Sequence, residues 1–83
     1  MRDKRSRHEI IVEILEVAVG GANVTKIVYS ANINFKMAQD YLSYLIKYGF
    51  IEILAKNGKK VYRTTDKGKT FIRKYKELED LHY

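Results

Sequence analysis

The chain has 83 residues, of which 46% are hydrophobic and 31% are charged, a composition typical of one small folded domain. It has no cysteine, and its two histidines, His8 and His82, lie far apart. We therefore expect no disulfide, no thiolate nucleophile and no metal site. No apolar run approaches the ~20 residues of a membrane span, and no signal-peptide pattern follows the basic N-terminus. These features predict a soluble, cytoplasmic protein.

Basic residues dominate the charge and are concentrated in two segments. Sixteen Lys and Arg against ten Asp and Glu give a formal net charge of +6. Residues 2–7 hold four of the basic residues and residues 56–76 hold nine. A charge run is often only a solvated surface, but this concentration favours a polyanionic partner. We interpret residues 1–7 as a flexible basic arm in which Arg5 and Arg7 contact a phosphate backbone, the alternative being a disordered terminus.

Apolar periodicity predicts four helices, over residues 8–19, 24–31, 35–48 and 66–81. Residues suited to cap their N-termini precede or begin them, namely Ser6, Asn23 or Thr25, Asn34 and Thr65. The Gly20-Gly21 pair is expected to end the first helix. Gly49 is expected to end the third helix in a Schellman motif, with Phe50 contacting Leu45.

The segment between the last two helices predicts a β-hairpin. Asn57-Gly58 separates two β-rich runs, and this dipeptide is typical of a type I′ turn, which requires positive φ at both positions. A two-residue turn pairs Lys56 with Lys59, whose like charges repel across the strands. Folding stability gives no reason for that pair, whereas an anionic partner would.

The same register assigns the two faces of the hairpin. Alternation directs one set of side chains toward the core, consisting of Ile51, Ile53 and Tyr62. The opposite face then carries an exposed pair, Leu54 and Val61, together with a cross-strand ion pair between Glu52 and Arg63.

The predicted order of helix, helix, turn, helix, hairpin and helix is that of a winged helix-turn-helix, a mainly α fold with a small β-hairpin and here an extra C-terminal helix. We assign residues 1–65 to the winged domain and residues 66–83 to that last helix. In such a fold the third helix enters the major groove of DNA. The candidate contacts lie on this helix and on the hairpin, and they are Asn34, Lys36, Gln39, Ser43, Lys47, Lys56, Asn57, Lys59, Lys60 and Arg63.

Each candidate contact has a plainer interpretation. The positions on the third helix are also those of an ordinary solvated helix face. The lysines at the hairpin tip would also protect an edge strand from pairing with another chain. Gln39 pairs well with adenine, and Lys36 reaches a guanine edge or a phosphate, so we favour DNA contact.

The last helix carries an apolar stripe that the small core does not need. A helix of ~16 residues extends ~24 Å, which takes its second half beyond the other three helices. We therefore expect a homodimer interface on this stripe, formed by Phe71, Tyr75, Leu78 and Leu81. The alternative is a terminal helix that folds back on its own domain or frays.

Nothing in the sequence predicts catalysis. The carboxylates are expected on solvated helix faces, there is no Gly-rich phosphate loop, and neither histidine has an evident partner. We expect no enzyme activity, no cofactor and no small-molecule ligand.

Three short motifs carry a family resemblance: Thr25-Lys-Ile, Leu42-x-x-Leu-Ile-x-x-Gly-Phe-Ile and Thr65-x-Lys-Gly. With them the chain resembles small archaeal winged-helix proteins that include the ten-kilodalton chromatin proteins of Sulfolobus and related regulators. The resemblance implies DNA binding without enzyme activity, often as a dimer through the last helix. By position it assigns recognition to Asn34, Lys36, Gln39 and Ser43, and hairpin contacts to Lys59 and Lys60. The chromatin proteins have a long terminal coiled coil, whereas this chain stops at Tyr83, which favours a compact regulator.

We therefore expect a dimeric protein that binds double-stranded DNA with full or partial sequence specificity, as a transcriptional regulator or a nucleoid-associated chromatin protein. The alternative is a protein-interaction module on a winged-helix scaffold, whose last helix docks on another protein.

Overall fold

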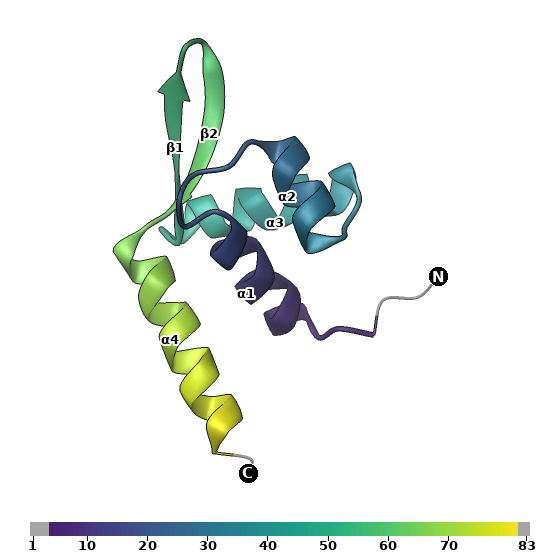
Figure 1. Ribbon diagram of the computed structural model, residues 1–83, viewed down its shortest axis with the longest axis vertical. Helices are drawn as coiled ribbons and strands as arrows, with labels where there is room; N and C mark the ends of the chain where they lie inside the picture. The colour runs from purple at the N-terminus through teal and green to yellow at the C-terminus, as the bar shows by residue number, and fades with distance from the viewer. Residues whose placement is uncertain (1–3, 82–83) are drawn as a thin grey trace.

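The computed structural model describes residues 4–81, which form four helices and one antiparallel hairpin (Figure 1). The elements in chain order are α1 (Arg7–Val17), α2 (Val24–Ala31), α3 (Phe35–Lys47), β1 (Ile51–Lys56), β2 (Lys59–Thr64) and α4 (Asp66–Asp80). This order confirms the mainly α, winged helix-turn-helix class with an extra C-terminal helix. Residues 1–3 of the expected arm and residues 82–83 of the expected terminal helix lie outside the described part.

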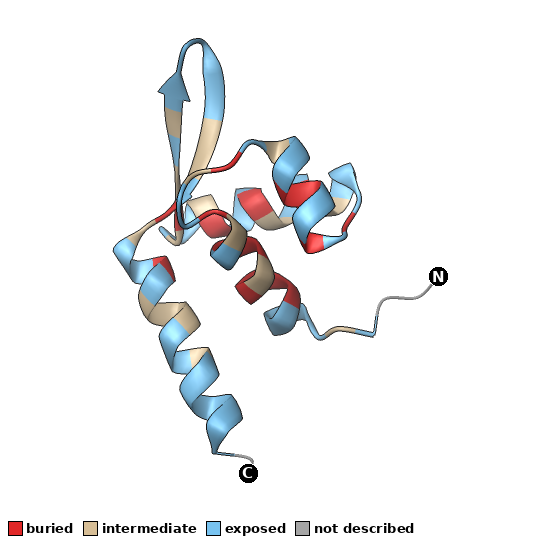
Figure 2. Cartoon of the chain, viewed as in Figure 1, coloured by how far each residue is buried: buried red, intermediate tan, exposed pale blue. Residues whose placement is uncertain are grey.

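The core lies between the first three helices and the base of the hairpin. Its largest fully buried side chains are Ile14, Leu15, Ile27, Leu45 and Ile51. Figure 2 shows buried residues along α1, α2 and α3, whereas the hairpin tip and most of α4 are exposed. The core therefore fixes the α2–α3 pair and leaves the hairpin and α4 projecting from it.

Local capping rules account for the helix boundaries. Ser6 and Glu9 form a capping box at the start of α1, with N···O distances of 3.1 Å and 3.0 Å. Asn23 caps α2 and Thr65 caps α4, as predicted. The end of α1 differs from the prediction, because the helix stops at Val17 with Ala18 as its C-cap, before the two glycines.

The third helix ends in the predicted Schellman motif. Gly49 has φ of +81°, and the amide of Phe50 donates to the carbonyl oxygen of Leu45 over 2.8 Å. The amide of Gly49 donates to the carbonyl oxygen of Ile46 over 3.1 Å. This ending turns the chain directly from α3 into β1.

The hairpin has the predicted register, from Ile51 opposite Thr64 to Lys56 opposite Lys59. Its faces differ from the prediction. Ile53 was expected in the core but is 45% exposed. The reason is that the hairpin projects from the body of the molecule, as Figure 1 shows, so on this face of β1 only Ile51 is in the core.

The expected exposed pair on the other hairpin face, Leu54 and Val61, is instead half-buried. Ala22 pairs with Tyr62 on the outer edge of β2 through two backbone hydrogen bonds of 2.9 Å and 2.8 Å. Gly21 lies so close that a Cβ there would be 3.0 Å from the Val61 side chain. The α1–α2 connection therefore covers this face of the hairpin base, which strand alternation alone does not predict.

The junction between β2 and α4 is fixed by long-range polar contacts. The buried Thr64 hydroxyl donates to the carbonyl oxygen of Leu15 over 2.6 Å. The Thr65 hydroxyl donates to the carbonyl oxygen of Gly49 over 2.6 Å, and the Lys67 ammonium donates to that of Tyr48 over 2.7 Å. These bonds hold the start of α4 against the ends of α1 and α3.

Beyond its first turns α4 departs from the domain. Phe71 and Ile72 pack partly against the core, whereas Leu78 is 60% exposed and Leu81 is 79% exposed. Lys76 forms an ion pair of 2.9 Å with Glu16 on α1, and this hydrogen bond raises the pKa of Lys76 above its usual value. The expectation that the core would leave the end of the stripe uncovered is confirmed. None of the described helices combines the length and apolarity needed to cross a bilayer.

Candidate nucleic-acid interface

The turn between α2 and α3 presents the N-terminal end of α3. Asn32 ends α2 in the left-handed conformation, with φ of +55°, and Ile33 anchors the turn in the core. The Asn34 side chain accepts a hydrogen bond of 2.8 Å from the amide of Met37 and caps α3. Its amide oxygen therefore serves the helix, and the role of Asn34 toward DNA stays a prediction.

The outer face of α3 lies opposite the buried side chains Ala38, Leu42 and Leu45. All four predicted contacts within this helix are exposed, namely Lys36, Gln39, Ser43 and Lys47. Asp40 shares this face and lies 3.4 Å from the Lys36 ammonium as an exposed ion pair. The exposed side of α3 thus combines charged groups of both signs with the Phe35 and Tyr44 rings, and its amide and hydroxyl groups suit hydrogen bonding to base edges.

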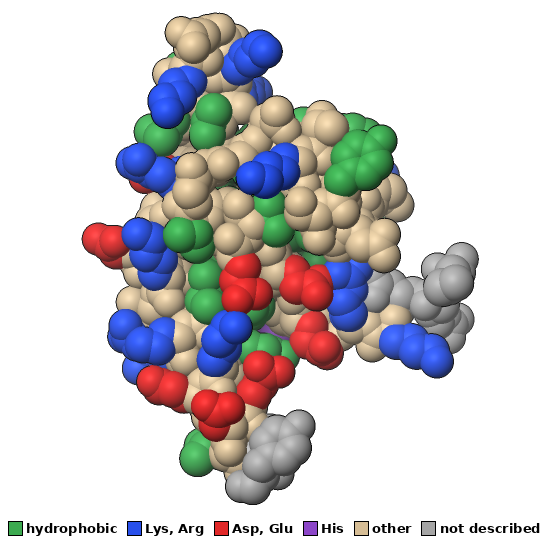
Figure 3. Space-filling view, in the orientation of Figure 1, with side chains coloured by type: hydrophobic (Ala, Val, Ile, Leu, Met, Phe, Trp, Pro, Cys, Tyr) green, Lys and Arg blue, Asp and Glu red, His purple; other side chains and the backbone are tan. Residues whose placement is uncertain are grey.

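Three exposed lysines make the hairpin tip basic. Asn57 and Gly58 have φ of +52° and +75°, as a type I′ turn requires. Lys56 and Lys59 are directly paired across the strands, and both are exposed together with Lys60. Figure 3 shows Lys and Arg side chains along the hairpin, without acidic side chains at its tip.

Arg63 lies further down the hairpin and has a partner on β1. Its Nε and one terminal nitrogen lie 3.1 Å and 3.0 Å from the same carboxylate oxygen of Glu52. This confirms the predicted cross-strand pair. The charge of Arg63 is largely compensated, so Arg63 is a weaker candidate for a phosphate contact than the tip lysines.

The predicted flexible arm is wrong for Arg5 and Arg7. Arg7 is the first residue of α1, after the Ser6 cap. Arg5 forms an ion pair with Glu13 and donates to the carbonyl oxygens of Ala31 and Asn32. The capping box and these contacts order the segment, so neither side chain belongs to a free arm.

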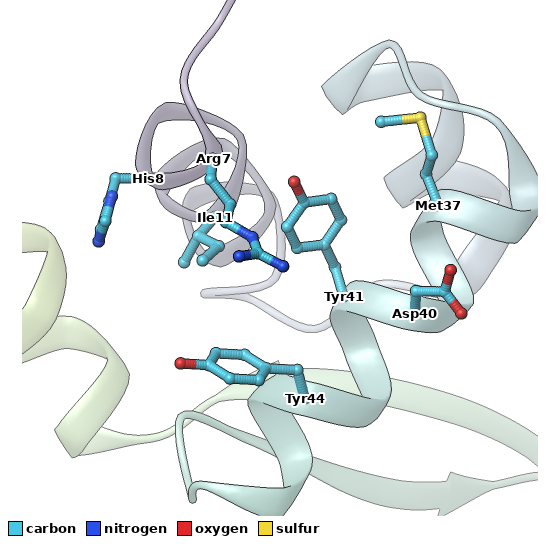
Figure 4. A pocket seen from close by; sticks show the side chains of 7 residues that line it. All are labelled: Arg7, His8, Ile11, Met37, Asp40, Tyr41 and Tyr44. Carbon is cyan, nitrogen blue, oxygen red and sulfur yellow. The ribbon is translucent and has the colours of Figure 1, made fainter.

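A groove between α1 and α3 was not found by sequence reasoning. It has a volume of about 460 Å³ and is lined by Arg7, His8, Ile11, Met37, Asp40, Tyr41 and Tyr44. Figure 4 shows Arg7 pointing from α1 into the space beside Tyr41 and Tyr44 of α3. The groove depends on how two separate helices pack, which periodicity within each helix does not reveal.

Apart from Glu52 at the hairpin base, most acidic side chains lie away from the hairpin. Figure 3 shows Asp and Glu gathered over α1 and the end of α4. The exposed acidic residues of that end are Glu77, Glu79 and Asp80, whereas the earlier turns of α4 carry Lys67, Lys69, Arg73, Lys74 and Lys76. Charge is therefore separated along α4 itself.

Comparison with known proteins agrees with this geometry. The sequence profile of the winged helix-turn-helix family matches residues 4–83. The chain belongs to this family. An uncharacterized protein of Methanocaldococcus jannaschii is 35% identical over 81 residues, which is 96% of this chain and 79% of that relative.

Two solved archaeal structures are also similar. Sso10a-2, a DNA-binding protein from Sulfolobus solfataricus, has 33% identity and a TM-score of 0.85, over 94% of this chain and 82% of Sso10a-2. A protein from Archaeoglobus fulgidus has a TM-score of 0.72 over 96% of this chain and 90% of its own, with 21% identity, a likeness of fold alone. The predicted resemblance to the archaeal winged-helix DNA-binding family is confirmed.

Proposed function

We propose that the protein binds double-stranded DNA and acts as a transcriptional regulator or a chromatin-associated protein. In this proposal α3 enters the major groove, and the hairpin tip lies over the adjacent minor groove or backbone. The observation that carries the proposal is the exposed, directly opposed pair Lys56–Lys59 with Lys60 beside it. The similarity to a DNA-binding protein of the same fold supports it.

The side chains divide into two kinds of contact. The lysines of the tip, with Lys47 at the end of α3, supply positive charge for phosphates, which gives affinity independent of sequence. Gln39 and Ser43 are exposed side chains of α3 that form directional hydrogen bonds with bases. Because such groups are few, we infer partial rather than stringent sequence specificity.

The proposal includes binding without catalysis and association with the nucleoid. Every acidic side chain between residues 4 and 81 is exposed or half-exposed, so none sits in the dry surroundings that tune a catalytic carboxyl group. Within the same residues, no three His, Asp or Glu side chains are grouped to hold a metal ion.

We further propose a homodimer formed through α4. Tyr75, Leu78 and Leu81 continue the apolar stripe of Phe71 beyond the core, and Leu78 and Leu81 are mostly exposed. The acidic residues of the last turn, Glu77, Glu79 and Asp80, follow earlier turns that carry five basic residues and one acidic residue, Asp66. This arrangement favours an antiparallel pairing, since the acidic end of each helix then meets basic turns of the second copy.

Salt dependence of duplex binding tests the DNA proposal. The logarithm of affinity should fall linearly with the logarithm of salt concentration. Lys59→Ala should reduce that slope by about 0.9, because one phosphate contact is lost. Lys74→Ala removes the same charge from an exposed site on α4 and should leave the slope unchanged. Absence of duplex binding at low salt, or equal losses in both variants, would contradict the proposal.

Sedimentation tests the dimer and its rival, a protein-interaction module that docks α4 on another protein. The exposed stripe on α4 motivates both. The pair Leu54–Val61, expected to be exposed, is half-buried and offers no second docking surface. The wild-type chain should sediment as a dimer, and Leu78→Asp should give a monomer, with Lys59→Ala on the hairpin as a dimeric control. A wild-type monomer that associates stably only with a foreign chain would favour the rival.

A further inference from the structure

Arg5 connects three parts of the fold that are distant in sequence. Its guanidinium donates to the carbonyl oxygen of Ala31 over 2.6 Å and to that of Asn32 over 2.9 Å. It also forms an ion pair with Glu13 on α1. The Arg5 side chain is only 21% exposed, so these contacts are partly shielded from water.

The end of α2 needs such a donor. The last carbonyl groups of a helix lack partners within the helix and carry the negative end of its dipole. No basic residue lies in the last turn of α2 to meet them. Arg5 supplies this charge from outside the helix, and hydrogen bonds from a charged donor are stronger than neutral ones. Glu13 compensates the guanidinium and orients its planar group.

The hydrogen bonds from Arg5 lie at the turn through which the chain enters α3. Asn32 begins the turn, Ile33 is buried, and Asn34 caps α3. Holding the carbonyl groups of Ala31 and Asn32 relative to α1 therefore holds the N-terminal end of α3. We propose that Arg5 is a positioning residue for DNA binding: it sets the placement of α3 through the turn without contacting DNA. This inference rests on the proposed function.

The competing account is that Arg5 contacts a phosphate of DNA directly. The two accounts predict opposite changes in DNA affinity for one substitution, Glu13→Gln. If Glu13 orients Arg5 for the turn, Glu13→Gln loosens the turn and weakens binding to DNA. If Glu13 instead holds Arg5 back from DNA, the same substitution frees a cation, which tightens binding and steepens the salt dependence.

The matched control lies one turn further along α1. Glu16 pairs with Lys76 on α4, away from the turn, at 2.9 Å. Glu16→Gln therefore removes the same charge from the same helix and also breaks an ion pair. Any difference between the two variants comes from the contact that each carboxylate makes, because the change in net charge is identical.

The experiment measures binding of the full chain to a labelled duplex by fluorescence anisotropy over a salt series. We expect Glu13→Gln to bind roughly tenfold more weakly than Glu16→Gln at each salt concentration, about 1.4 kcal/mol, with an unchanged slope. Tighter binding with a steeper slope, or identical affinities for the two variants, would overturn the proposal. Failure of the wild-type chain to bind any duplex would instead contradict the proposed function.

A second pair of variants guards against loss of folding. Arg5→Lys keeps the charge but not the planar fork, and Arg5→Gln removes the charge. With circular dichroism showing both folded at the assay temperature, Arg5→Gln should bind weakly with the wild-type salt slope, and Arg5→Lys should recover part of the affinity. A slope lowered by about 0.9 in Arg5→Gln would identify a phosphate contact. A lower melting temperature with wild-type affinity would reduce Arg5 to a stabilising role, and either result overturns the proposal.

Discussion

Replacing Gly68 with alanine tests how closely α4 is seated on the winged domain. Gly68 lies in the first turn of α4 and is buried. A Cβ atom at this position would lie 2.4 Å from the carbonyl oxygen of Phe50 and 2.5 Å from Cγ2 of Thr64. Neither neighbour yields easily, because one is backbone and the other belongs to a side chain held by its hydrogen bond to Leu15.

Two opposing effects decide the sign of the change in stability. Alanine is favoured over glycine within a helix by roughly 0.8–1.0 kcal/mol. Overpacking a filled site costs about 1–3 kcal/mol, and a backbone contact of this kind belongs at the upper end of that range. We therefore expect Gly68→Ala to lower the free energy of unfolding by about 2 kcal/mol, although its local helix propensity improves.

Urea unfolding of the full chain, followed by circular dichroism, measures this change. The control is Gly20→Ala, because a Cβ at Gly20 would have no atom within 4 Å and its φ is not positive. That variant should be neutral or more stable by about 0.4–1 kcal/mol. In a domain of this size, 1 kcal/mol corresponds to roughly 4–8 °C in melting temperature. A Gly68→Ala protein as stable as the wild type would refute the reasoning.

Two further substitutions test single hydrogen bonds. Thr64→Val keeps the shape of a buried side chain but removes the donor to the Leu15 carbonyl group, and should cost about 1–3 kcal/mol by urea unfolding; an unchanged midpoint would mean that the bond contributes nothing. Asn34→Asp keeps a good N-cap and places a negative charge at the start of α3. Its unfolding midpoint should stay near that of the wild type while duplex affinity falls, and unaltered affinity would place Asn34 away from DNA.

Features with a local cause were predictable from the sequence. The Asn57-Gly58 turn fixed the hairpin register because both positions take positive φ. The end of α3 was predictable because Gly49 and Phe50 together satisfy the last carbonyl groups of the helix. In each case the deciding residues lie within a few positions of one another.

Features caused by contacts between distant segments were not predictable. Thr64 and Leu15 are separated by 49 positions, and Arg5 and Ala31 by 26. Strand alternation predicts which face of the hairpin a side chain lies on, and it therefore placed Ile53 in the core. Alternation does not predict how far the core extends along the hairpin. The groove between α1 and α3 likewise arises from the packing of two helices.

The hairpin tip provides a test in which stability and binding should change in opposite directions. Protection of an edge strand explains why lysines lie there, but it does not explain why Lys56 and Lys59 face each other. The same hairpin pairs opposite charges further down, at Glu52 and Arg63. Lys59→Glu creates an opposite pair with Lys56 and should stabilise the hairpin by about 0.2–1 kcal/mol.

In duplex binding, Lys59→Glu should lower both the affinity and the salt slope, because it replaces a phosphate contact with a repelling charge. Lys74→Glu on α4 reverses the same charge at a distance from the hairpin, and so measures the effect of net charge alone. If the tip lysines serve only to protect the edge, Lys59→Glu and Lys74→Glu will reduce binding equally. A loss confined to Lys59→Glu, in a protein at least as stable as the wild type, would mean that the repulsion between the lysines is tolerated because both contact DNA.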